Sequence, residues 1–80
     1  MKINAIKELV QTHSIEELNC LIAQLENGEA LSYPVHGDDE GEQLTHLLGA
    51  AWIKEQMALN KSEFKTELRN FSSRVRESIS

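Results

Sequence analysis

Two histidines and three of the acids in the eleven residues 36–46 offer the ligand types of a metal site. Glu42 and His46 are four residues apart, so on a helix their side chains share one face, as paired ligands must. The sequence lacks the glutamate between two histidines of a zinc protease, and it has no cysteine pair. The candidate ligands are His36, Asp38, Asp39, Glu42 and His46. Their spacing matches no standard metal site. The simpler interpretation is that the acids cap a helix and that a histidine lies near an interface.

Nucleophiles and bases are present, but no catalytic signature surrounds them. Cys20, Ser14 and Ser32 lie in no nucleophile elbow or triad pattern, and the four glycines are too scattered to cradle a phosphate. His13 ends a predicted helix, where a cation is favourable, so its expected role is capping. We therefore expect no enzyme activity and no cofactor.

The single cysteine, Cys20, excludes an internal disulfide, which favours a reducing cytoplasm as the setting. No neighbouring motif lowers its pKa, so we interpret Cys20 as an inert small residue. No apolar run is long enough to span a bilayer. The expectation is a cytoplasmic protein with no membrane partner.

The net charge of −5 is unevenly distributed: residues 1–50 carry −7 and residues 51–80 carry +2. An acidic chain repels the nucleic-acid backbone. The last helical segment, residues 62–78, carries the bases Lys65, Arg69, Arg74 and Arg76. Acids are interleaved with them, and no aromatic residue lies on the polar face to stack a base. We therefore predict no nucleic-acid partner.

Apolar periodicity and capping signals predict four helices, over residues 3–12, 15–27, 39–60 and 62–78. Ser14 and Glu17 form a capping-box pattern, and Asn27-Gly28 supplies a left-handed residue that ends a helix. Asp39 begins the third helix, and Ser62 is the expected cap of the fourth. These signals predict an all-α fold in a single domain over residues 1–80.

The segment 29–37 lacks helical spacing and instead alternates apolar and polar residues. Leu31, Tyr33 and Val35 alternate with Ser32 and Pro34, a pattern of extended chain in which the proline confines any strand to an edge. Two alternatives follow. The segment lies across the helices as ordered coil, or it pairs with the same segment of a second chain.

The predicted helix at 39–60 is apolar on two sides. The wider stripe, which we expect to face the core, contains Leu44, Leu47, Leu48, Ala51, Trp52, Ala58 and Leu59. The narrower line contains His46, Ala50, Ile53 and Met57. A surface helix does not ordinarily carry such a second line, so it predicts an interface with another copy or partner. Gly49 and Ala50 mark a point of close packing.

Four segments together resemble a family of short uncharacterised proteins from Bacteroidetes-type bacteria. They are the opening MKI…IKELV, the HSIEEL capping box, DDEGEQLTH leading into AAWI, and FKTELRNF…RVRESIS. The resemblance implies a small bacterial cytoplasmic domain and assigns no catalytic residues. It also suggests an accessory role in redox metabolism, which the lone Cys20 does not directly support.

These observations predict a compact four-helix arrangement with one extended linker at about 29–37. The expected core is Ile6, Val10, Leu18, Ile22, Leu25, Leu44, Leu48, Ala51, Trp52, Phe64, Leu68, Phe71 and Val75. The favoured function is a protein–protein interaction module that homodimerises or docks an unknown protein partner. Its predicted interface is His46, Ala50, Ile53 and Met57, with Tyr33 and Val35. The alternative is a small-ligand or metal-binding accessory protein that uses the His36 to His46 cluster.

Overall fold

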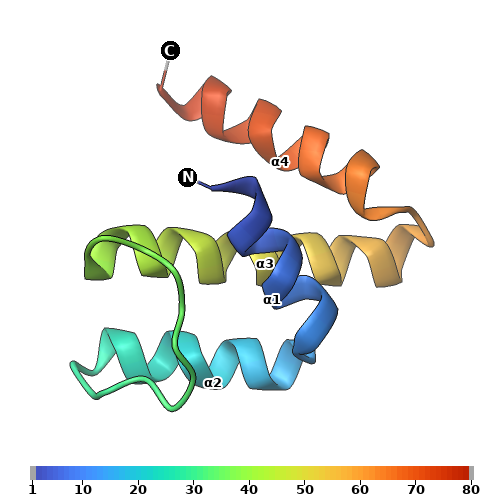
Figure 1. Ribbon diagram of the computed structural model, residues 1–80. Helices are drawn as coiled ribbons and strands as arrows, with labels where there is room; N and C mark the ends of the chain where they lie inside the picture. Colours follow the sequence, from blue (N-terminus) through green and yellow to red (C-terminus); the bar gives the residue numbers. More distant parts are fainter. Residues whose placement is uncertain (1, 80) are drawn as a thin grey trace.

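The computed structural model describes residues 2–79, and side chains as far as Arg74. Its helices are α1 (Ile3–Thr12), α2 (Ile15–Glu26), α3 (Glu40–Asn60) and α4 (Phe64–Ile79), joined by a coil link over 27–39 (Figure 1). The all-α fold predicted from the sequence is confirmed, and the helix bounds agree to within two residues. No strand occurs among residues 2–79, and no helix in that range is long and apolar enough to cross a membrane.

Capping residues set the predicted helix ends. The Ser14 hydroxyl accepts a hydrogen bond from the Glu17 N–H, and the Glu17 carboxylate accepts from the Ser14 N–H, which completes the capping box at α2. The Asp39 carboxylate accepts from the Glu42 N–H at 2.7 Å at the start of α3. Gly28, with φ of 74°, follows α2 as the left-handed residue. Local hydrogen bonds therefore fix where these helices begin and end.

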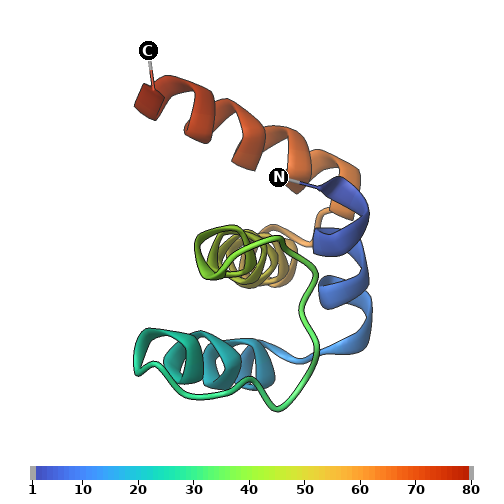
Figure 2. The same cartoon turned by 60° about the vertical axis from the view of Figure 1, so that its left-hand side comes forward.

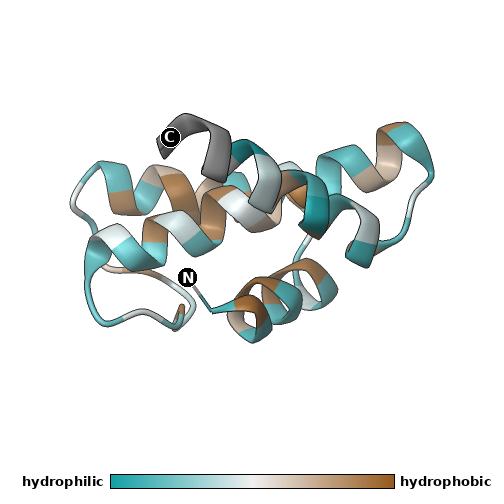
Figure 3. Ribbon diagram, turned by 90° about the horizontal axis from the view of Figure 1, so that it is seen from above, coloured by the Kyte–Doolittle hydropathy of each residue, from teal (hydrophilic) through white to brown (hydrophobic). Residues whose placement is uncertain are grey.

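Helix α3 is the central element, and α1, α2 and α4 each pack against it. In Figure 1, α4, α3 and α2 form three tiers, and α1 crosses α3. Figure 2 looks nearly along α3 and shows α1 and the link on one side of it, with no described helix on the opposite side. Apolar and polar segments alternate along the helices in Figure 3, as expected for amphipathic elements that each cover one face. One side of α3 is therefore covered and one is open.

The prediction that the wider stripe of α3 faces the core is confirmed for Leu47, which is completely buried, and is wrong for Leu48 and Leu59. His46, Ala50 and Ile53, from the narrower apolar line, are completely buried, whereas Leu48 is 48% exposed and Leu59 is 69% exposed. Both sides are apolar, so helical periodicity could not decide between them. The side that α1 covers became the core.

The rest of the core surrounds these buried residues of α3. Buried apolar side chains form one cluster of Ile6, Leu9, Val10, Leu18, Leu21, Ile22, Val35, Leu47, Ala50 and Ile53. Several predicted core residues are only partly buried against this cluster, namely Leu25, Leu44, Ala51, Trp52, Phe64, Leu68 and Phe71. The predicted core residue Val75 lies outside the described side chains. The confirmed core residues are Ile6, Val10, Leu18 and Ile22.

Polar side chains of α3 hold both ends of α1. At its start, the Lys2 N–H donates to His46 Nε2 at 2.9 Å. At its end, the Lys54 ammonium donates to the Val10 carbonyl at 2.9 Å and to the His13 carbonyl. Helix ends carry N–H and C=O groups that lack partners within the helix, and a cation is favourable at the C-terminal end. The two side chains therefore give each end of α1 the hydrogen-bonding partner that it lacks.

The corner between α3 and α4 is built around a buried carboxylate. Glu67 is only 2% exposed, and its oxygens accept from Ser62 Oγ at 2.6 Å, Asn70 Nδ2 at 3.1 Å and Asn60 Nδ2 at 3.2 Å. Ser62 is therefore a donor to Glu67, and α4 begins two residues later than predicted because Ser62 does not cap it. Hydrogen bonds from Ser62 and then Asn70 lower the pKa of Glu67 below its ordinary value of 4.5.

Replacing Lys54 with methionine keeps an unbranched apolar stem and removes the ammonium. We expect Lys54→Met to lower the free energy of unfolding by about 1–3 kcal/mol, because the Val10 and His13 carbonyls lose a charged donor. Urea unfolding followed by circular dichroism measures this. The control is Lys65→Met, an exposed lysine on α4, with an expected change within about 0.5 kcal/mol. Equal losses in both variants would contradict the role of Lys54.

Acid should weaken the α3–α4 corner. Because the pKa of Glu67 is lower in the folded chain than in the unfolded one, its contribution to stability is complete above pH 4.5 and is lost as the pH falls through the folded value. We expect Glu67→Gln to be less stable than wild type at pH 7 and to lose less stability on acidification. The loss of stability of Ser62→Ala on acidification should be smaller than that of wild type and larger than that of Glu67→Gln. Chemical unfolding over a series of pH values tests this, and identical acid dependence in wild type and Glu67→Gln would refute it.

Candidate functional site

The candidate metal ligands do not converge. The Asp39 carboxylate caps the start of α3 by accepting from the Glu42 N–H. The exposed His36 has its Nε2 3.4 Å from a carboxylate oxygen of Glu8. His46 is buried beneath the start of α1. Among the described side chains, no group of three or more His, Cys, Asp or Glu residues could hold a metal ion. The cluster is close in sequence, but its side chains have separate structural roles.

His46 has no ring nitrogen available for a ligand. Its Nε2 accepts from the Lys2 N–H, and its Nδ1 lies 2.7 Å from the His36 carbonyl oxygen. Because a carbonyl can only accept, Nδ1 carries the proton and donates it. The ring is thus a neutral bridge between the start of α1 and the link, which are 34 residues apart in sequence.

The predicted interface residues lie mostly inside the chain. His46, Ala50, Ile53 and Val35 are buried, and Met57 and Tyr33 are half-buried. The Tyr33 hydroxyl donates to Glu8 Oε1 at 2.9 Å. The link therefore packs as coil against its own helices, and the second apolar line of α3 is covered by α1 and the link rather than presented to solvent.

The open side of α3 forms the base of a shallow groove of about 450 Å³ between α2 and α4. We call this feature the open groove, and its lining is Asn19 and Ile22 of α2, Leu48, Ala51, Trp52 and Glu55 of α3, and Phe71 and Arg74 of α4. Five of these residues were predicted to be core, namely Ile22, Leu48, Ala51, Trp52 and Phe71. Apolar surface that periodicity placed inside is thus gathered at one solvent-facing site.

Aromatic contacts organise one wall of the open groove. The rings of Trp52 and Phe71 have centroids 5.9 Å apart and are tilted by 42°. The Arg74 guanidinium lies 5.6 Å from the centroid of the Trp52 ring, within cation–π range. Gly49 lies beneath Phe71, because a Cβ there would approach the ring to 3.1 Å. Gly49, which the sequence marked as a point of close packing, therefore packs against the Phe71 ring.

Comparison with known proteins gives the chain a family but no activity. A model described as a family of unknown function, DUF6952, matches residues 1–80. The chain belongs to this family. No curated protein and no solved structure matches it. Membership in DUF6952 confirms the resemblance to an uncharacterised family, and it assigns no role to any residue.

In this DUF6952 chain, sequence reasoning missed the open groove because it interpreted Leu48 and Trp52 as core. One signal could have corrected this. His46 and Lys54 stand on either side of Ala50 and Ile53 in the sequence, at a spacing close to the length of the first helix. Polar residues at such positions can hold the ends of a neighbouring helix, which favours burial of the line between them.

We expect His46→Phe to lower the free energy of unfolding by about 1–3 kcal/mol. Phenylalanine keeps a planar ring but leaves the Lys2 N–H and the His36 carbonyl without their partner. Thermal and urea unfolding measure the loss. The matched control is His36→Phe, which alters an exposed ring and retains the carbonyl, with an expected change within about 0.5 kcal/mol. A stable His46→Phe protein would show that the bridge is dispensable.

Proposed function

We propose that this protein is a non-catalytic interaction module that forms a homodimer through the open groove. The observation that carries the proposal is the 48% exposure of Leu48, with half-buried Trp52 and Phe71 in the lining of the same groove. Burial of apolar surface of this kind is the main driving force of association. Contiguous apolar surface on a small protein commonly marks an interaction site.

A second copy of the chain is the occupant that the charges favour. The open groove carries one acid, Glu55, on α3 and one base, Arg74, on α4. In a two-fold dimer the same patch meets itself, so that Glu55 of each copy can approach the partner's Arg74. Complementary charges at the edge of an apolar patch fix the register of an interface. A groove of one charge sign would instead have favoured a different partner.

Chain length supports the same proposal. A domain of 80 residues buries only about 60–65% of its unfolded surface, and its stability is correspondingly modest. Covering the open groove would add buried apolar area at about 25 cal/mol per Å². Dimerisation would therefore stabilise the fold as well as create an interface. We propose a bacterial cytoplasmic setting on the basis of the resemblance described above.

The ligand-binding alternative at the His36 to His46 cluster has less support. His46 uses both ring nitrogens within the chain, and Asp39 uses its carboxylate as a helix cap. Neither group is available to a ligand without breaking a contact that holds the fold. The groove therefore provides the stronger argument for function.

Substituting glutamate for Leu48 tests the interface directly. We expect Leu48→Glu to raise the dimer dissociation constant at least about tenfold, which corresponds to about 1.4 kcal/mol, because a charge would be buried against apolar side chains. Sedimentation equilibrium over the micromolar range measures it. The control is Leu59→Glu, which places the same charge on the same helix outside the open groove and should leave the dimer intact. A monomeric wild type would overturn the proposal.

Charge exchange tests the arrangement of the two copies. Glu55→Arg and Arg74→Glu should each weaken the dimer, and the double variant should regain most of the affinity. Circular dichroism of each variant establishes that the monomer fold is retained. A double variant that is as weak as the singles would exclude this pairing.

A further inference from the structure

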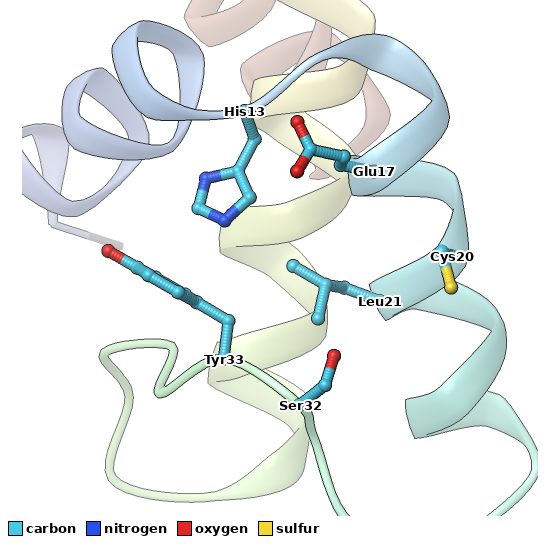
Figure 4. A pocket seen from close by; sticks show the side chains of 6 residues that line it. All are labelled: His13, Glu17, Cys20, Leu21, Ser32 and Tyr33. Carbon is cyan, nitrogen blue, oxygen red and sulfur yellow. The ribbon is translucent and has the colours of Figure 1, made fainter.

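A second hollow, which shares no lining residue with the open groove, lies between the end of α1, the first turns of α2 and the link. Its volume is about 280 Å³, and it is lined by His13, Glu17, Cys20, Leu21, Ser32 and Tyr33 (Figure 4). The homodimer proposal does not use it. Its polar groups have a common property that indicates the kind of ligand it would accept.

The hydrogen bonds of the neighbouring threonine fix the tautomer of His13. The Thr12 hydroxyl donates its proton to the Glu8 carbonyl at 2.7 Å, so its oxygen can only accept from His13 Nδ1, also at 2.7 Å. Nδ1 therefore carries a ring proton, and in the neutral imidazole Nε2 carries the lone pair. His13 is only 9% exposed, and Nε2 points into the hollow, where no described residue donates to it.

The other polar groups of the hollow also present acceptors. One oxygen of the Glu17 carboxylate accepts from the Ser14 N–H, and hydrogen bonds from the Ser14 backbone and then its hydroxyl lower the pKa of Glu17 below 4.5, so it is ionised at neutral pH. Figure 4 shows this carboxylate beside the His13 ring. The other carboxylate oxygen is left to meet a ligand.

The hydroxyl protons of Ser32 and Tyr33 are donated in hydrogen bonds to residues that do not line the hollow. The Ser32 N–H and hydroxyl both donate to Gln24 Oε1, at 3.0 and 3.3 Å, and in Figure 4 the Ser32 oxygen points toward the hollow. The Tyr33 hydroxyl donates to Glu8, which raises the pKa of Tyr33 above 10.0 and leaves its ring as a wall. The ring meets His13 edge to face at 4.3 Å. The hollow thus combines hydrogen-bond acceptors, one negative charge and an aromatic wall.

We propose that this hollow binds the ammonium or guanidinium group of a small organic cation, held by His13 Nε2 and the Glu17 carboxylate against the Tyr33 ring. Such a group donates several hydrogen bonds, carries the opposite charge and is attracted by aromatic rings. An anion would meet only acceptors and a negative charge. The volume is slightly below the usual range of small-molecule pockets, about 300–1,000 Å³, and suits the end group of a small molecule. The net charge of −5 attracts cations to the protein surface.

Binding is tested by nuclear magnetic resonance titration of the full chain with methylguanidine and with n-propylamine, each at fixed ionic strength. We expect saturable shifts of the Leu21 and Ser32 amides and of the His13 Nε2 nitrogen. The neutral analogue n-propanol should cause none. Equal shifts with n-propanol, or no saturable shift with either cation, would overturn the proposal.

Two neighbouring glutamates provide a matched pair of variants. Glu17→Gln removes the charge but keeps a side chain that completes the capping box, and it should weaken cation binding about threefold to fivefold. Glu16→Gln removes the same charge from an exposed residue that does not line the hollow, and it should leave binding unchanged. Equal weakening by both variants would show that only general charge attraction acts, which would overturn the site.

His13→Phe removes the Nε2 acceptor and should abolish binding, and the Glu17→Gln comparison keeps the test valid if this variant unfolds. A blocked Gly-Arg-Gly tripeptide distinguishes the two sources of a guanidinium group. Tighter binding of the tripeptide than of methylguanidine would assign the hollow to an arginine side chain. Equal or weaker binding would assign it to a free small cation.

Discussion

The hold that α3 has on both ends of α1 is the interaction on which the rest of this fold depends. His46 accepts from the main chain at the start of α1, and Lys54 donates to the main chain at its end. The two side chains are eight residues apart, which on a helix corresponds to about 12 Å, close to the length of the short helix between them. This match of lengths sets both the position and the direction of α1 on α3. The apolar residues between the two polar contacts are then buried by necessity.

Covering one side of α3 leaves its other side without a partner. Ala50 and Ile53 are buried, and Figure 2 shows α1 on one side of α3, with α2 below it and α4 above it. The remaining side, with Leu48 and Trp52, faces solvent at the base of the open groove. No helix among residues 2–79 covers that side. The open groove is therefore a direct result of how α1 is held, and it is the basis of the proposed homodimer.

The parts of the fold that could be predicted from sequence are those with local causes. Ser14 with Glu17, Asp39 and Gly28 act through neighbours within a few residues, so their patterns placed the helix ends correctly. The orientation of α3 has a non-local cause, since the partner of Lys54 is the end of a helix more than forty residues away. Periodicity records only that both sides of α3 are apolar.

The same distinction explains the site residues. His46 attracted attention as a ligand because histidine is scarce and chemically versatile, yet a buried histidine with two main-chain partners serves packing. No sequence pattern indicated that Glu67 is buried, because its three neutral donors come from the end of α3, the turn that follows it and α4. His13 was interpreted as a capping residue. Its place in a hollow could not be predicted, because only the fold brings the link against its ring.

The bridge at His46 also has a consequence for how this sequence can drift. Its two partners, at residues 2 and 36, take part through the peptide backbone and not through their side chains. Many substitutions at those two positions would keep the contact, whereas the imidazole offers a donor and an acceptor on opposite edges of one compact ring, and few other side chains can do so. In this bridge the requirement for a particular side chain therefore falls on His46 alone, and residues 2 and 36 are open to variation.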